Sequence, residues 1–158
     1  CTVRLGQRDV RVAFLGVVIP SNRPTWSRLG DPIDAARREA KLLRDSADVI
    51  VALTHVSVED DGRLVADAPE IDVVLGGHEH ENYTLLRGPR FVPVLKADAN
   101  ARSAQVVTVV LARKGQRPTV TSRLVTIGEP MPEDSAVARV AFSIAEIGAA
   151  ARIKRLWP

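Results

Sequence analysis

The sequence contains a single cysteine, Cys1, so the chain cannot form an internal disulfide. Cysteine usage therefore does not indicate whether the protein works in an oxidising or a reducing compartment. Aromatic residues make up only 4% of the chain, which leaves few platforms on which bases could stack. The net charge of +3 comes from arginines scattered along the chain, so we expect no nucleic-acid partner. No apolar run approaches the ~20 residues that span a bilayer, and we expect no membrane partner.

The first residue allows two interpretations. The chain begins with Cys1 rather than methionine, and no signal-peptide pattern follows. Cys1 could be the lipidated end of a mature protein, or the chain could be cut at this point, and we favour the second interpretation. The length of 158 residues and the hydrophobic content of 46% are enough for one domain with a buried core.

Histidine is also scarce, and two of the three histidines follow a glycine pair. The apolar run over residues 71–75 is typical of a buried parallel strand, and it ends at Gly76 and Gly77. Glycines here permit positive φ angles and a close approach of the backbone to a bound ion. His78 and His80 come next, two residues apart, so their side chains can share one side of an extended chain.

The remaining histidine, His55, has a similar setting. It follows a second apolar run, residues 48–53, and in open α/β sheets the carboxyl ends of the strands are where ligands bind. A lone histidine at a strand end is more often a hydrogen-bonded surface or core residue than a ligand. The Gly-Gly-His-Glu-His pattern is less easily explained in that way, because paired imidazoles suit metals such as zinc. We therefore predict a metal site that contains His55, His78 and His80.

The hydrophobic pattern predicts an α/β fold in which a mixed β-sheet has flanking helices. Helices are expected over residues 31–45 and 63–68 and from residue 135 onward, the first with Asp31 as its N-cap and Pro32 in its first turn. Trp26 is expected to pack on that first helix. The last two strands are expected to form an antiparallel hairpin. Strands are predicted over residues 2–7, 10–19, 48–53, 71–75, 82–87, 90–96, 104–112 and 119–127.

Several polar residues near the strand ends have open roles. The acidic residues 59–61 could supply a metal carboxylate, although such a cluster more often begins a helix or lies in a solvated loop. Glu79 and Glu81 flank the histidines and lie either beside the metals or in solvent. Asp98 and Asn100 could orient a ligating histidine through its second nitrogen, or they could make Asx turns.

Three short segments resemble a known family when they are taken in order. They are Leu-Thr-His ending at residue 55, Gly-Gly-His-Glu-His ending at residue 80, and Lys-Ala-Asp-Ala-Asn ending at residue 100. This order resembles the calcineurin-like metallophosphoesterases and, more narrowly, the bacterial 5′-nucleotidase and cyclic-nucleotide phosphodiesterase family. The resemblance implies that residues 1–129 form the C-terminal half of a four-layer αββα sandwich. It implies that residues 130–158 are a linker and helix leading toward an absent substrate-binding domain.

The resemblance also implies a pair of divalent transition metal ions, such as zinc, manganese or iron, at the sheet edge. By position, His55 and His78 would ligate one metal and His80 the other. The family's other ligands, and the histidine that faces the substrate phosphate, belong to motifs that are not found before His55. We therefore expect an incomplete site, with partial or no metal occupancy and no independent activity.

The function implied by the resemblance is hydrolysis of phosphate esters, including nucleotides, by a periplasmic or secreted enzyme. Two alternatives stay open. In the first, His55, His78 and His80 hold a single metal with an open water position, and the chain is a complete hydrolase. In the second, the chain is a non-enzymatic assembly module. Its exposed apolar sheet would then be covered by a missing N-terminal half or by a second copy of the chain.

Overall fold

The computed structural model describes residues 1–21, 25–113, 115–128 and 131–156, with side chains described up to residue 145. The chain falls into two compact units, Cys1–Thr126 and Ile127–Pro158. The second unit contains helix α3 (Ser135–Leu156), close to the helix expected from residue 135 onward. Among the described residues, no helix is long and apolar enough to span a membrane.

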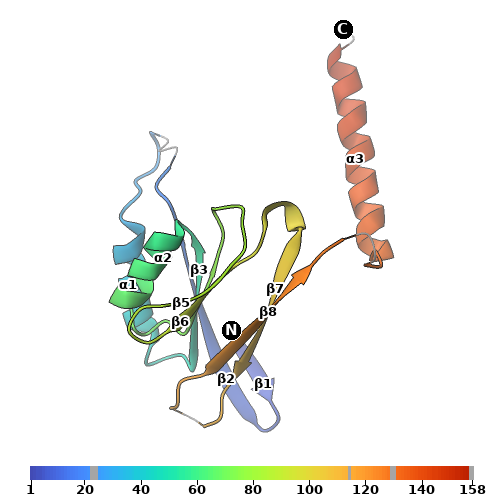
Figure 1. The fold of residues 1–158 in the computed structure, drawn as a ribbon. Coiled ribbons are helices and arrows are strands. Elements are labelled where there is room, and N and C mark those ends of the chain that lie inside the picture. Colours follow the sequence, from blue (N-terminus) through green and yellow to red (C-terminus); the bar gives the residue numbers. More distant parts are fainter. Residues whose placement is uncertain (22–24, 114, 129–130, 157–158) are drawn as a thin grey trace. The chain divides into compact units, whose positions relative to one another are not determined.

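A mixed six-stranded sheet lies at the centre of the first unit (Figure 1). Its strands are arranged in the order β1-β2-β3-β4-β6-β5, in which β2, β3, β4 and β6 run parallel. The edge strands β1 and β5 run antiparallel to their neighbours. Because the parallel strands share a direction, their last residues form one border of the sheet, here called the carboxyl edge. The strands are β1 (Thr2–Leu5), β2 (Arg8–Val18), β3 (Val49–His55), β4 (Val73–Gly76), β5 (Tyr83–Arg87) and β6 (Val92–Lys96).

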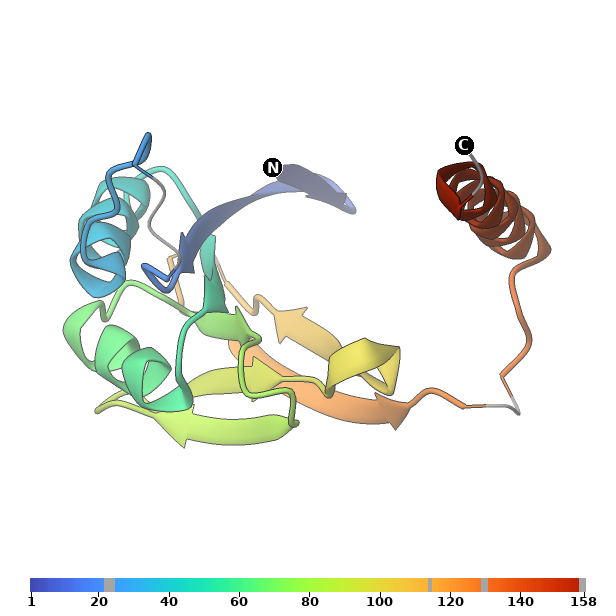
Figure 2. The same cartoon turned by 90° about the horizontal axis from the view of Figure 1, so that it is seen from above.

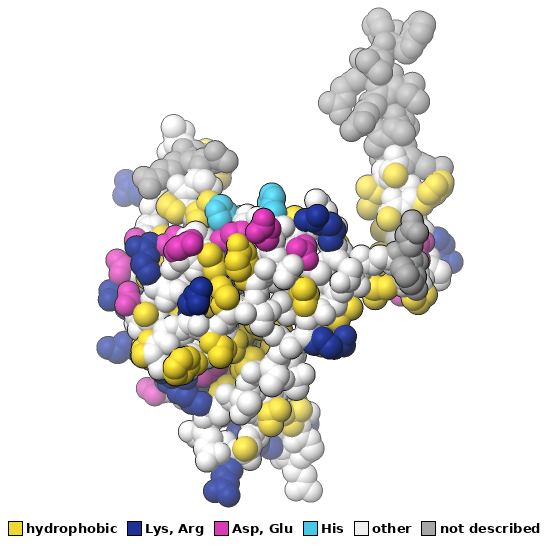
Figure 3. All heavy atoms as spheres, viewed as in Figure 1, with side chains coloured by type: hydrophobic (Ala, Val, Ile, Leu, Met, Phe, Trp, Pro, Cys, Tyr) yellow, Lys and Arg dark blue, Asp and Glu magenta, His cyan; other side chains and the backbone are white. Residues whose placement is uncertain are grey.

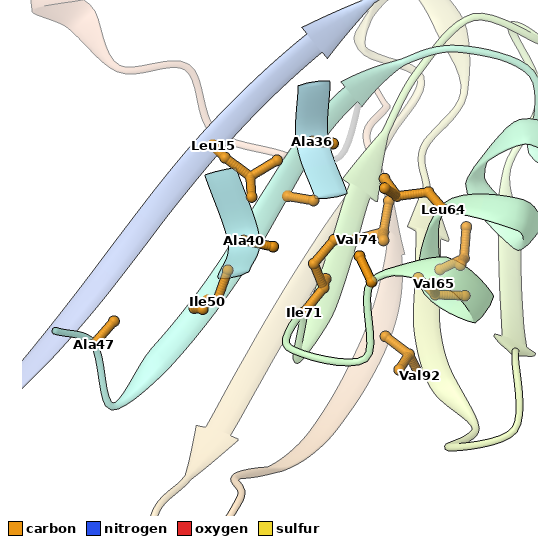
Figure 4. Packing of buried hydrophobic residues seen from close by; sticks show 13 residues of the cluster. Leu15, Ala36, Ala40, Ala47, Ile50, Leu64, Val65, Ile71, Val74 and Val92 are labelled. Carbon is orange, nitrogen blue, oxygen red and sulfur yellow. The ribbon is translucent and has the colours of Figure 1, made fainter. Parts of the chain in front are cut away.

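Two helices, α1 (Pro32–Leu43) and α2 (Val58–Asp67), cover one face of this sheet, here called the helix face (Figure 2). The start of α1 agrees with the prediction, since the Asp31 side chain accepts a hydrogen bond of 2.9 Å from the backbone N–H of Asp34. Side chains of the helices and the strands form a continuous core between them (Figure 4). Its fully buried members include Ala36, Ala40, Ile50, Ala52, Leu64, Val65, Ile71, Val74 and Val94.

Helix α2 begins five residues earlier than predicted, at Val58 instead of residue 63. The Ser57 hydroxyl caps the helix by accepting a hydrogen bond of 3.1 Å from the backbone N–H of Asp60. Acidic residues 59–61 occupy the first turn, where negative charge favours the positive end of the helix dipole. This acidic cluster is therefore a helix start. The earlier start also turns Asp61 inward, together with Leu64 and Val65.

The opposite face of the sheet is covered only in part. A hairpin of β7 (Ser103–Val110) and β8 (Thr119–Thr126) forms a second, antiparallel sheet, as predicted. Its apolar residues pack on a core cluster that consists of Val10, Val49, Val51, Val73 and Leu95. The carboxyl halves of β2 and β3 extend beyond this cover. By strand alternation Phe14, Val18 and Leu53 lie on this side of the sheet, and they are 52%, 60% and 45% exposed. We call these three side chains the open face.

The prediction for Trp26 was wrong. The side chain is 86% exposed, so it does not pack on α1. The apolar stripe of that helix, with Ala36 and Ala40 fully buried, is already packed on the sheet. The outer surface of α1 carries Arg37 and Lys41, which offer an indole ring little apolar area.

Candidate metal centre

His55 is the final residue of β3 and lies on the carboxyl edge. It is paired with Val18 of β2, and its carbonyl accepts a hydrogen bond of 2.9 Å from the backbone N–H of Ile19. Successive strand side chains point to opposite faces, so His55 shares the side of Leu53, while Thr54 faces the helices. The imidazole is thus exposed beside the open face.

His78 lies in the loop that follows β4, and its ring meets the ring of His55. The two ring centroids are 5.5 Å apart, with an edge-to-face angle of 76°. The backbone of the loop lies close to His55, since a Cβ added at Gly77 would lie 3.4 Å from the His55 Nδ1 atom. Figure 3 shows histidine side chains beside acidic ones along this border. Two neighbouring imidazoles of this kind fit the donor preference of a divalent transition metal.

His80 belongs to the same loop but is placed differently. Its side chain is exposed, and its carbonyl accepts a hydrogen bond of 3.2 Å from the backbone N–H of Ala99. Among the residues that the structure describes, no three histidine, cysteine, aspartate or glutamate side chains form a group that could hold one metal ion. The described geometry thus brings His55 and His78 together and does not join His80 to them in a three-ligand group.

Glu79 lies between two exposed histidines but points inward, with a side chain that is 17% exposed. Its Oε2 atom lies 2.6 Å from the Nζ atom of Lys96, which also lies 2.9 Å from Asp61 Oδ2. Burial alone would raise the pKa of Glu79, but hydrogen bonds from Lys96 and from the backbone outweigh it, so the pKa lies below its ordinary value. Burial raises the pKa of Asp61, although Thr54 and Lys96 oppose that effect. The sequence analysis missed Lys96 and the inward position of Asp61.

Asp98 and Asn100 lie in the connection between β6 and β7. The Asp98 carboxylate accepts hydrogen bonds from the Asn82 side chain, at 3.1 Å, and from the Ser103 hydroxyl. The Ser103 bond and then the Asn82 bond hold the pKa of Asp98 below its ordinary value. Asn100 has a positive φ of 60° within a single 3-10 turn. The described partners of Asp98 thus tie two loops together, and its orientation of a histidine stays a prediction.

Two curated proteins share sequence with part of this chain. The uncharacterized metallophosphoesterase YunD of Bacillus subtilis is 33% identical over 78 residues, which are 47% of this chain and 17% of that protein. An apyrase of Aedes aegypti is 44% identical over 54 residues, or 33% of this chain and 10% of that protein. Over part of its length the chain is therefore similar in sequence to metallophosphoesterases. No family model matches the chain.

Two solved structures are similar to this chain in fold. The 5′-nucleotidase precursor of Thermus thermophilus superposes with a TM-score of 0.74 at 21% identity, covering 95% of this chain and 34% of that one. A putative 5′-nucleotidase of Staphylococcus aureus gives a TM-score of 0.65 at 14% identity, with 92% and 33% covered. The fold is therefore that of one part of these structures, which confirms the predicted α/β class. The chain spans about a third of the length of these structures.

Proposed function

We propose that this chain supplies part of the metal centre of a phosphoesterase that hydrolyses nucleotides or related phosphate esters. One observation carries the proposal: the rings of His55 and His78 meet at the carboxyl edge of the sheet, in a chain that is similar in part to a metallophosphoesterase. The likeness of the fold to 5′-nucleotidases supports a nucleotide as the substrate. An exported location is part of the proposal, and it agrees with the description of the Thermus protein as a precursor.

His55 and His78 would hold one divalent ion, and His80 would contribute to a second. Zinc, manganese and iron suit imidazole ligands better than magnesium does. Such ions supply charge that polarises a phosphate ester and activates water. A shared two-metal site agrees better with the structure than a three-histidine site, because the described residues form no group of three potential ligands. The protein's own part is to hold the imidazoles at the edge where substrate can approach.

The open face supports the view that the catalytic unit has a further part. Phe14, Val18 and Leu53 leave apolar area exposed directly beside His55. We propose that this area is covered by an N-terminal half of the catalytic unit or by a second copy of the chain. Either would bring further ligands and the groups that face the phosphate, so we expect the chain alone to show negligible turnover.

The first test is a calorimetric titration of the purified chain with Zn²⁺ and with Co²⁺. His55→Ala and His78→Ala should each abolish the same binding event, whereas His80→Ala should leave that event in place. Hydrolysis of p-nitrophenyl phosphate and of a nucleoside monophosphate should stay at the background rate. One tight ion that is lost in all three variants, together with turnover, would favour the single-metal hydrolase. Absence of binding, in an oligomer that EDTA does not affect, would favour the assembly module.

A further inference from the structure

A buried lysine lies directly behind the histidines. Lys96 is the last residue of β6, and it is only 1% exposed. Its ammonium donates to the backbone carbonyls of Val56 and Gly77, at 2.8 Å each, and to Glu79 at 2.6 Å. These three bonds use the three protons of the ammonium, and Asp61 adds an ion pair at 2.9 Å. A lysine this deeply buried is uncommon unless charged partners surround it, as they do here.

The partners of Lys96 are neighbours of the histidines in the chain. Val56 directly follows His55, Gly77 directly precedes His78, and Glu79 separates His78 from His80. One ammonium therefore restrains every segment that carries a histidine. The Glu79 carboxylate extends this restraint, because its other oxygen accepts a hydrogen bond of 2.5 Å from the backbone N–H of Val58.

The backbone between these anchors is strained. His78 has a φ of 99° and His80 a φ of 64°, in the left-handed region that residues other than glycine rarely adopt. Such conformations persist only where the surroundings over-determine them. The inward bonds of Glu79 and the bond of 2.9 Å from the Gly77 N–H to the Thr54 carbonyl supply that constraint. With Glu79 held inside, the flanking His78 and His80 are both directed outward from the loop.

We propose that Lys96 and Glu79 are positioning residues that hold the three histidines in a metal-binding arrangement, with Asp61 balancing the buried charge. The inference rests on the proposed function. It adds that a buried ion pair on the helix face of the sheet restrains the histidines at the carboxyl edge. A buried ion pair is weak evidence for added stability, because desolvation offsets the attraction between the charges, whereas the four partners of Lys96 all lie in or beside the segments that carry the histidines. We therefore assign to Lys96 and Glu79 the role of fixing the conformation of the loop that carries His78 and His80.

The test compares two glutamates that flank His80. Glu79→Ala removes the inward anchor, and Glu81→Ala removes an equal charge from an exposed side chain whose described partner is the Tyr83 hydroxyl. In metal-free protein, amide exchange at Gly77 should accelerate roughly tenfold or more in Glu79→Ala and stay unchanged in Glu81→Ala. In a Zn²⁺ competition titration, Glu79→Ala should lose about 10–100-fold in affinity and Glu81→Ala less than about twofold.

Rescue separates positioning from simple loss of structure. Glu79→Gln keeps an acceptor for Lys96 or for Val58, so it should recover most of the lost Zn²⁺ affinity. If Glu79→Ala does not fold, Val58→Pro leaves Glu79 in place and removes the backbone N–H that donates to it, at a first helical position where proline is tolerated. Its Zn²⁺ affinity should also fall.

The possible failures are distinguishable. If the unsubstituted chain does not bind Zn²⁺, the proposed function fails, and the exchange measurement still tests the restraint of the loop. If the unsubstituted chain binds Zn²⁺ and Glu79→Ala binds it equally well, with Gly77 exchange unchanged, the positioning role is overturned while the metal centre stands. Equal losses in Glu79→Ala and Glu81→Ala would also overturn it, because charge rather than geometry would then set the affinity.

Discussion

The two faces of the six-stranded sheet differ in how completely they are covered. On the helix face, α1 and α2 leave Ile50, Leu64 and Val74 fully buried. On the other side, the β7–β8 hairpin covers one part and leaves Phe14 and Leu53 about half exposed. The uncovered part is the one beside His55. We therefore expect the helix face to contribute more of the stability of the chain than the open face, whose apolar side chains stay exposed.

The largest expected contrast is between two leucines. Leu64→Ala opens a cavity in the helix-face core, where the side chain is fully buried, and should lower the free energy of unfolding by about 2–5 kcal/mol. Leu53→Ala, at 45% exposure on the open face, should lower it by less than about 1 kcal/mol. Urea denaturation of the chain measures both values. A similar loss in the two variants would mean that the open face is covered in solution.

Two glycines allow the helix face and the open face to be compared through the addition of a single methyl group. A Cβ at Gly76 would lie 2.8 Å from Thr54 Oγ1 and 2.9 Å from Lys96 Cε, so Gly76→Ala should destabilise the chain by about 1–3 kcal/mol through overpacking. Gly16 lies on the side of the open face, where the nearest atom to an added Cβ is the Leu53 carbonyl oxygen at 3.9 Å. Gly16→Ala should therefore stay within about 0.5 kcal/mol of the parent. Thermal unfolding of both variants tests the comparison, which a harmless Gly76→Ala would contradict.

The smallest expected effect depends on pH. The pKa of Glu79 in the folded chain lies below its ordinary value of 4.5, so its ionised form stabilises the fold above that pH. This contribution is lost as the pH falls through the folded pKa. Glu79→Gln should therefore lower the stability by about 1 kcal/mol at pH 7, and the difference from the parent should shrink as the pH falls below 4.5. Melting curves of the parent and of Glu79→Gln from pH 7 to pH 3 measure this difference in stability. A difference that grows in acid would contradict a lowered pKa for Glu79.

The contact between His55 and His78 follows from rules that the sequence reveals. Both residues follow apolar runs typical of parallel strands, and the carboxyl ends of such strands meet at one edge. Their ring contact, at 5.5 Å, agrees with that expectation. The β7–β8 hairpin could also be predicted from the sequence, because apolar alternation marks its strands and turn residues mark their ends.

Lys96 and Asp61 could not be placed in the same way. Charged residues are almost never fully buried unless they are paired, and a pair from separate segments is invisible to local patterns. A weak signal exists in retrospect. Lys96 falls two residues after Val94, on the helix face of β6, and Asp61 precedes Leu64 by three on the inner side of α2. A cation and an anion that both occupy core-facing positions in neighbouring elements indicate a buried pair.

The His55–His78 pair comes from one strand–helix–strand unit, formed by β3, α2 and β4, together with the loop that follows β4, and Lys96 comes later, in β6. This arrangement has a consequence for genetic exchange. A recombination that transferred the segment from Val49 to Lys96 would move the paired imidazoles together with the ammonium that restrains them. The two imidazoles and their buried ammonium could thus be inherited as one contiguous segment, and a recipient sheet would need only one parallel strand beside β3.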